Sequence, residues 1–387
     1  MKHEIYLLDI DNVLIAPIGY RESFAFSINY ILHNIGWSDT ESHDGVAEIF
    51  EAYGITNEWD MVAICLASLF VSVSDCIGDK SLPSDPKHAL SFISNLDVPK
   101  QALDFICLAR EVGKMYMKGN DSILPTVVAF ELLVSVDNDS LNSLIKNVLL
   151  NYRDINKSLT MQIFQNYAVG SRNFTKTYGF ESLFEQVSLL SEKDEPLLSF
   201  YNAERLIYLA KQNIINPVIF TARPSLPPKG VDDDANHYSP EAELAVQLLG
   251  LDELPMIGSG RTDWLAFNTG GDPSDYIKPN PVHALAAIGA AISHDEENSL
   301  MAAYELVLSG QLLHPLSLLI DSTVNVTVFE DSARNIESVK NSVKLLEMYG
   351  IQCVFSAVGI GIHEEKRSVL KKSGARVFTN INDALTL

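Results

Sequence analysis

The feature that most constrains the fold is a long stretch with helical periodicity. It separates one short apolar run at the start of the sequence from a later region in which apolar runs and helical segments alternate. Residues 4–8, EIYLL, form an apolar run that predicts a buried strand ending at Asp9. From about residue 195, apolar runs alternate with helical segments, which predicts a mostly parallel sheet with helices on both faces. The residues between, 16–195, have helical spacing and few strand-like runs. We therefore expect a helical block inserted into an α/β domain after its first strand.

The expected elements can be placed along the chain. Helical spacing in the inserted block covers residues 22–32, 59–70, 100–117 and 141–150. In the α/β portion we expect helices over residues 203–212 and 239–250, the second with Ser239 as its cap, and strands over residues 217–220, 324–329, 352–358 and 375–379. Two acidic stretches, 224–236 and 292–298, predict surface loops. The expected domains are an α/β domain of residues 1–15 and 196–387 and a helical domain of residues 16–195.

Composition limits the classes of partner. The chain has 28 Lys and Arg against 50 Asp and Glu, a formal net charge of −22. Such an acidic chain lacks the basic surface of a general nucleic-acid binder and is repelled by anionic membranes, so neither partner is expected. The beginning of the sequence has two aspartates where a signal peptide needs apolar residues, and the longest apolar run, residues 61–73, is interrupted by serines. We expect a cytoplasmic protein.

Cysteine and histidine spacing gives no metal or disulfide framework. The 4 cysteines form no CxxC pair, and the 9 histidines show neither HxH nor HExxH spacing. Zinc sites and disulfide scaffolds are therefore not expected.

Reactive side chains stand at the ends of the expected strands, where open α/β sheets bind their ligands. Asp9 and Asp11 follow the first strand, so one carboxylate could attack a bound group while the other handles a proton. Asp331, with Glu330 before it, follows a later strand and could complete oxygen coordination of Mg²⁺ with Asp9.

Two further positions could act on the same group. Thr221 follows the strand at residues 217–220 and could donate its hydroxyl to a phosphoryl oxygen. Lys278, in YIKPNP before an expected helix, could offset the negative charge and hold phosphoryl oxygens. Each of these signals is weak alone, and their order along the chain gives them weight.

Four segments in this order resemble the sequence motifs of the haloacid-dehalogenase-like hydrolase superfamily: DIDNVL, IFTAR, a lysine before proline, and VFEDSARN. The resemblance covers roughly residues 1–15 and 195–387 and implies a Rossmann-like three-layer α/β/α core. The helical block occupies the position of a cap inserted after the first motif, although it is much larger than the usual helical cap. Asn12 stands where the family usually has glycine, and Asn tolerates the left-handed backbone that this turn requires.

The resemblance also implies roles for the residues. Asp9 would be the nucleophile that forms an aspartyl-phosphate, and Asp11 the acid and base, while Thr221 and Lys278 would bind the phosphoryl group. Mg²⁺ would be held by Asp9, the backbone carbonyl of Asp11 and Asp331, with Glu330 acting through water. Relatives that remove halide lack an acid at the position of Asp11, so phosphoryl transfer is favoured over dehalogenation.

The sequence therefore predicts a Mg²⁺-dependent phosphatase that acts on a small phosphorylated metabolite. Arg223 and Arg21 are candidate contacts to the substrate, because one follows the strand that ends at Thr221 and the other lies just beyond the first motif. A phosphomutase or phosphotransferase with the same residues is an alternative, and a non-catalytic metabolite-binding relative is another. The sequence identifies neither the substrate nor the oligomeric state.

Overall fold

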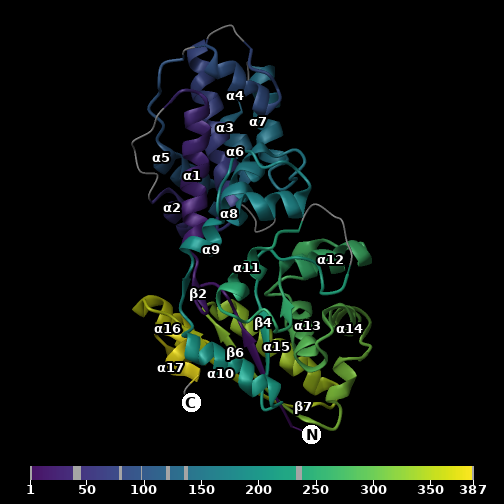
Figure 1. Cartoon of the computed structure of the whole chain (residues 1–387). Coiled ribbons are helices and arrows are strands. Elements are labelled where there is room, and N and C mark those ends of the chain that lie inside the picture. Colours follow the sequence, from purple (N-terminus) through teal and green to yellow (C-terminus); the bar gives the residue numbers. More distant parts are fainter. Residues whose placement is uncertain are drawn as a thin grey trace. The chain divides into compact units, whose positions relative to one another are not determined.

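The computed structural model describes residues 2–37, 45–77, 81–96, 98–118, 123–134, 138–231 and 238–385 (Figure 1). The chain forms two compact units, one of Met1–Pro17 with Asp194–Leu387 and one of Ile18–Lys193. Part of the expected acidic loop at 224–236 lies outside the described residues.

The first unit is built on a six-stranded sheet in the order β5-β4-β1-β6-β7-β8, with every neighbouring pair parallel. The strands are β1 (Lys2–Leu8), β4 (Asn216–Phe220), β5 (Met256–Ile257), β6 (Thr323–Glu330), β7 (Gln352–Ile360) and β8 (Arg376–Phe378). β1 lies between β4 and β6, so the strand from the start of the chain, purple in Figure 1, is in the interior of the sheet. All five expected strands form, and the two-residue β5 is too short to give a periodic signal.

Helices cover both faces of this sheet. They are α10 (Phe200–Lys211), α11 (Glu241–Leu248), α12 (Ser259–Thr269), α13 (Pro281–Ser293), α14 (Glu296–Ser309), α15 (Ala333–Met348), α16 (Glu364–Lys372) and α17 (Ile381–Leu385), with short 3₁₀ helices at Pro273–Asp275 and Leu316–Leu319. One core joins the sheet to α13, α14 and α15, and a second core joins its other face to α10, α11 and α17. The predicted α/β fold with a mostly parallel sheet is therefore confirmed.

The alternation of side chains along the strands explains the two cores. Ile5 and Leu7 of β1 point into the core with α13, whereas Leu8 points into the core with α10. On β4, Val218 and Ile219 divide in the same way. Because successive strand residues face opposite sides, an uninterrupted apolar run is what a strand covered on both faces requires.

Two local expectations in this unit were wrong. Residues 292–298 are not a surface loop, because α13 runs to Ser293 and α14 begins at Glu296, which is buried. The carboxylate of Glu296 is paired with the buried Arg261 at 3.1 Å, so its charge is neutralised inside the protein. Ser239 does not cap α11, since its hydroxyl donates to the side chain of Glu241 at 2.9 Å and Pro240 takes the cap position.

The second unit is helical, and its described residues contain no strand. Its helices are α1 (Ile18–Asn34), α2 (Val46–Ala52), α3 (Glu58–Ile77), α4 (Pro86–Ser94), α5 (Phe105–Lys118), α6 (Pro125–Leu133), α7 (Asp139–Leu150), α8 (Leu159–Tyr178) and α9 (Leu189–Lys193). Helix α3 packs against α1, α6, α7 and α8. Helix α8 is kinked at Gly170, whose φ of 79° is left-handed. A Cβ there would lie 2.5 Å from the backbone nitrogen of Ser188, so glycine is required.

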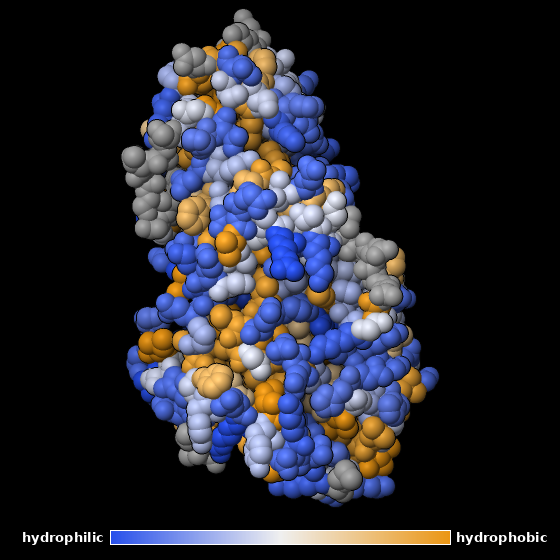
Figure 2. Space-filling model, in the orientation of Figure 1, coloured by the Kyte–Doolittle hydropathy of each residue, from blue (hydrophilic) through white to orange (hydrophobic). Residues whose placement is uncertain are grey.

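The two chain segments that connect the units lie next to each other in the α/β unit. β2 (Ile15–Ala16) leads out of the first motif and pairs antiparallel with β3 (Glu195–Pro196), where the chain returns. Hydrophilic residues cover much of the face of the molecule that Figure 2 shows. Within the described residues, no helix combines the length and apolarity needed to span a bilayer.

Candidate functional site

The carboxyl ends of three adjacent strands bring the predicted site residues together. Asp9 directly follows β1, Thr221 follows β4, and Glu330 is the last residue of β6. The backbone nitrogen of Asp9 donates to the carbonyl of Phe329 on β6 at 3.1 Å, which extends the parallel pairing as far as the site. Positions that are hundreds of residues apart in the chain therefore meet at one edge of the sheet.

Lys278 lies at the centre of this cluster. Its Nζ donates to Asp9 Oδ1 at 2.7 Å, to Glu330 Oε2 at 3.0 Å and to the carbonyl of Phe220 at 3.3 Å. Burial of the side chain alone would lower the pKa of Lys278, but the neighbouring carboxylates of Asp9 and Glu330 outweigh burial and raise it. The ammonium is thus kept charged and has a fixed place between two carboxyl groups.

Three carboxyl groups form a set that could hold a divalent cation. One oxygen from each of Asp9, Glu330 and Asp331 lies within 4.8 Å of the others. Oε1 of Glu330 accepts from the backbone nitrogens of Asp331 and Ser332 and from the Asn335 amide, each at 3.2 Å. An all-oxygen set with this much negative charge fits Mg²⁺, which also retains water or substrate oxygens as ligands.

The three carboxyl groups differ in their preference for a proton. Burial, followed by the charge of Glu330, raises the pKa of Asp9 well above its ordinary value. Burial and Glu330 also raise the pKa of Asp331. For Glu330, burial is outweighed by the Lys278 ammonium and by hydrogen bonds, so its pKa is lowered. Asp9 and Asp331 therefore bind a proton more readily than ordinary aspartates, and a bound cation would favour their ionised forms.

Asp331 has a cationic partner that the sequence did not indicate. The Nζ of Lys366, in the first turn of α16, donates to Asp331 Oδ2. This lysine is 35 residues from Asp331 and lies in an ordinary charged segment, EEKR, so only the pairing in the fold identifies it.

Asp11 is held by a residue that was expected to contact substrate. The guanidinium of Arg223 donates to Asp11 Oδ1 from Nε at 2.9 Å, and it also donates to Asp194 Oδ2 at 2.9 Å. Arg223 is buried, with its side chain 1% exposed. Its contact with a substrate stays a prediction, and Asp194 is a residue that sequence reasoning missed.

Two short segments fix the backbone around the site. Asn12 has a φ of 60°, the left-handed geometry expected where an asparagine replaces glycine, and its nitrogen donates to the Ile15 carbonyl at 2.8 Å. Thr221 is fully buried, and its Oγ1 accepts from the Arg223 nitrogen at 3.1 Å. The proposed phosphoryl contact of Thr221 stays a prediction.

The backbone of Lys278 is positioned by a buried histidine that sequence reasoning also missed. His283 Nδ1 accepts from the Lys278 nitrogen at 2.8 Å, and its Nε2 lies 2.9 Å from the Ile257 carbonyl. Burial lowers the pKa of His283 to about 3. The ring is therefore neutral, with its proton on Nε2, and acts as a bridge between the Lys278 segment and β5.

Arg21 belongs to the helical unit and has protein partners there. Its guanidinium on α1 donates to Glu48 and Glu51, both at 2.9 Å. These ion pairs join α1 to α2. The expected contact of Arg21 with a substrate stays a prediction.

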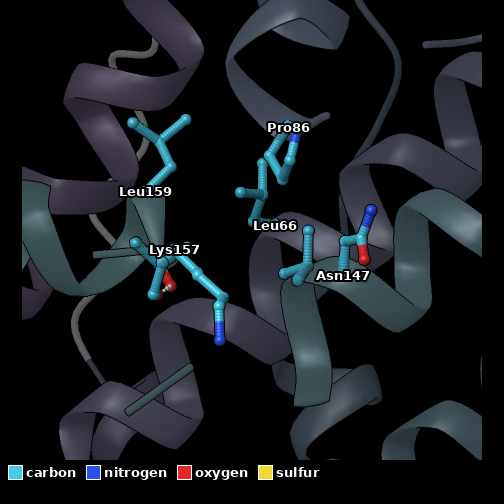
Figure 3. Close-up of a pocket in the computed structure, with 8 residues that line it drawn as sticks. Leu66, Pro86, Asn147, Lys157 and Leu159 are labelled. Carbon is cyan, nitrogen blue, oxygen red and sulfur yellow. Dashed lines mark hydrogen bonds between the residues drawn. The ribbon is translucent and has the colours of Figure 1, made fainter. Parts of the chain in front are cut away.

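A hollow in the helical unit is a weaker candidate for a ligand site. It lies at the start of α8 and is lined by Leu66, Pro86, Asn147, Val148 and residues 157–160 (Figure 3). The space between these side chains does not admit a water-sized sphere, whereas most ligand pockets enclose roughly 300–1,000 Å³. The polar groups in it also have partners, since Lys157 pairs with Asp154 at 2.8 Å and Ser158 with Thr160 at 3.0 Å.

Comparisons with known proteins extend the description of the fold. No protein-family model and no curated protein sequence matches the chain significantly. A crystal structure solved as a Northeast Structural Genomics Consortium target superposes with a TM-score of 0.63 at 14% identity, covering 100% of this chain and 98% of that chain. A phosphatase from Thermococcus thioreducens superposes with a TM-score of 0.42 at 14% identity, covering 95% of this chain and 99% of that one. The first likeness concerns the fold alone.

Proposed function

We propose that the chain is a Mg²⁺-dependent phosphatase that acts on a small phosphorylated metabolite through an aspartyl-phosphate on Asp9. The observation that carries the proposal is the buried Lys278 ammonium between Asp9 and Glu330, beside Asp331, at the carboxyl edge of the sheet. A buried cation among acids is costly to assemble, and it is useful where a negatively charged group must approach a carboxylate nucleophile.

The proposed cation has a ligand set on this chain. Asp9, Asp331 and the carbonyl of Asp11 would hold Mg²⁺, with Glu330 acting through water. When bound, Mg²⁺ offsets charge on the phosphoryl oxygens and so lowers the barrier to nucleophilic attack.

The residues then divide the reaction between them. Asp9 attacks phosphorus, and the bond from phosphorus to the leaving oxygen breaks as the Asp9–phosphorus bond forms. The Lys278 ammonium and the Thr221 hydroxyl donate to the phosphoryl oxygens during this step. Asp11 gives its proton to the leaving oxygen, then takes a proton from the water that hydrolyses the aspartyl-phosphate. The product is inorganic phosphate, and Asp9 and Asp11 return to their starting forms.

The test is release of inorganic phosphate from a panel of phosphate monoesters, with Mg²⁺ or with a chelator. Wild-type protein is compared with Asp9→Asn and with Asp252→Asn, which changes an exposed aspartate of the same unit. We expect Mg²⁺-dependent release by the wild type and the Asp252 variant and none by the Asp9 variant. Release by Asp9→Asn at the wild-type rate would exclude Asp9 as the nucleophile. Transfer of phosphate to a second metabolite, without hydrolysis, would indicate a phosphotransferase.

A further inference from the structure

The carboxylate of Asp11 is held at two points by one buried side chain. Arg223 approaches Asp11 Oδ1 with Nε at 2.9 Å and with Nη2 at 2.8 Å. Because both nitrogens belong to one planar guanidinium, the two contacts fix the position of this Asp11 oxygen relative to Arg223.

Arg223 is in turn held from the other side. Its Nη2 donates to Asp194 Oδ2 at 2.9 Å, and its Nη1 lies 3.5 Å from the Glu241 carbonyl. The side chains of Arg223 and Asp194 are both only 1% exposed. A buried guanidinium needs such partners to offset its loss of hydration, so removal of Asp194 would free Arg223 to change its orientation.

The location of Asp194 in the chain adds to this arrangement. It is the first residue of the α/β unit after the helical unit, and it directly precedes β3. β3 pairs with β2, and Ile15 of β2 forms a bridge with Asp11. The segment that returns from the helical unit therefore contacts the Asp11 loop both through its backbone and through Arg223.

We infer that Asp194 and Arg223 are positioning residues that aim the Asp11 carboxyl group at the leaving oxygen of the substrate. The inference deepens the proposed function and rests on it. Asp194 acts through Arg223 and does not contact the reacting atoms, and the role of Arg223 is to fix the proton donor.

A proton donor matters only when the leaving group needs a proton. The p-nitrophenolate of p-nitrophenyl phosphate departs readily without protonation, whereas the alkoxide of glycerol 2-phosphate does not. A misdirected Asp11 should therefore lower kcat for glycerol 2-phosphate far more than for p-nitrophenyl phosphate. A purely structural defect would lower both values by the same factor.

Two variants test the arrangement and one controls for it. Asp194→Asn keeps the shape of the side chain and removes its charge, and Arg223→Lys keeps the charge and removes the two-point hold. Arg261→Lys is the matched control, because Arg261 is also a buried arginine between two carboxylates, Glu243 and Glu296. Thermal unfolding of each variant, measured beforehand, sets an assay temperature at which all of them are folded.

The measured quantity is kcat on glycerol 2-phosphate divided by kcat on p-nitrophenyl phosphate, with KM determined separately for each ester. For Asp194→Asn and Arg223→Lys, we expect kcat on glycerol 2-phosphate to fall roughly tenfold or more relative to p-nitrophenyl phosphate, part of the roughly 10²–10⁴-fold that acid–base catalysis contributes. The ratio should be unchanged in Arg261→Lys. Equal losses on both esters in an otherwise active enzyme would overturn this inference alone. No phosphate release by the wild type would overturn the proposed function, and this inference with it.

Discussion

The buried Asp60 of the helical unit should make the stability of that unit depend on pH. Asp60 lies in the first turn of α3 and is 2% exposed. Its Oδ1 has no hydrogen-bond partner among the described residues, and Arg153 Nη2 is 3.7 Å away. Burial raises the pKa of Asp60 to about 6, with Arg153 and Tyr152 opposing the effect in part.

The size and sign of the effect follow from this pKa. In the unfolded chain the group titrates near its ordinary value of 3.8, so between pH 4 and pH 6 the folded protein binds the additional proton. The stabilising contribution of the protonated acid is complete below pH 4 and is lost as pH rises through about 6. The gap between 3.8 and about 6 corresponds to about 3 kcal/mol of unfolding free energy, at 1.36 kcal/mol for each pKa unit.

Asp60→Asn removes the titration and keeps the shape of the side chain. We expect the unfolding free energy of the variant, minus that of the wild type, to increase by about 3 kcal/mol from pH 4 to pH 8 when both are measured by denaturant unfolding. A Trp264→Phe background makes tryptophan fluorescence specific to the helical unit, because the other tryptophans, Trp37 and Trp59, both belong to it. Asp139→Asn, which changes an exposed aspartate on α7, controls for the loss of one charge. An Asp60 variant whose stability difference from the wild type stays constant with pH would refute the reasoning.

Two further predictions concern the groups around Lys278 and Asp331. His283→Phe should cost about 1–3 kcal/mol of unfolding free energy, because the backbone nitrogen of Lys278 loses its acceptor. Denaturant unfolding with no measurable loss of stability would contradict the bridging role of His283. Lys366→Gln should tighten Mn²⁺ or Mg²⁺ binding measured by calorimetry on chelator-treated protein, because it removes the ammonium that contacts Asp331. Lys371→Gln, on the same helix, is the control, and equal affinities in the two variants would count against competition between Lys366 and the metal.

Strand-end residues were predictable from the sequence because their position depends on local pattern. An apolar run that ends in an acid predicts both the strand and the edge at which the acid lies, and Asp9, Thr221 and Glu330 meet at that edge. The expectation of phosphate chemistry came from the motif resemblance and not from the strand pattern, and it stays a proposal. Only the order of the motifs along the chain supported Lys278, whose contacts lie at the centre of the site.

Two of the residues that were missed, Asp194 and Lys366, act through partners distant in the sequence. Asp194 meets Arg223 across 29 residues, and Lys366 meets Asp331 across 35. No local periodicity indicates such a pair, because the sequence around Asp194 and around Lys366 fits a solvated charged segment equally well. The prediction of a surface loop at residues 292–298 was wrong for the same reason. The acidic residues there suggest a loop, and only the fold shows that Glu296 pairs with the buried Arg261.

The covalent state of Asp9 during turnover tests the central claim most directly. Wild-type protein is mixed with its best phosphate ester and Mg²⁺, quenched in acid within a single turnover, and treated with borohydride, which reduces an acyl phosphate to an alcohol. Peptide mass mapping then locates the reduced residue. The account predicts reduction at Asp9 in the wild type and none in the chelator-treated sample. Turnover without any modified residue, or modification at another carboxylate, would contradict it.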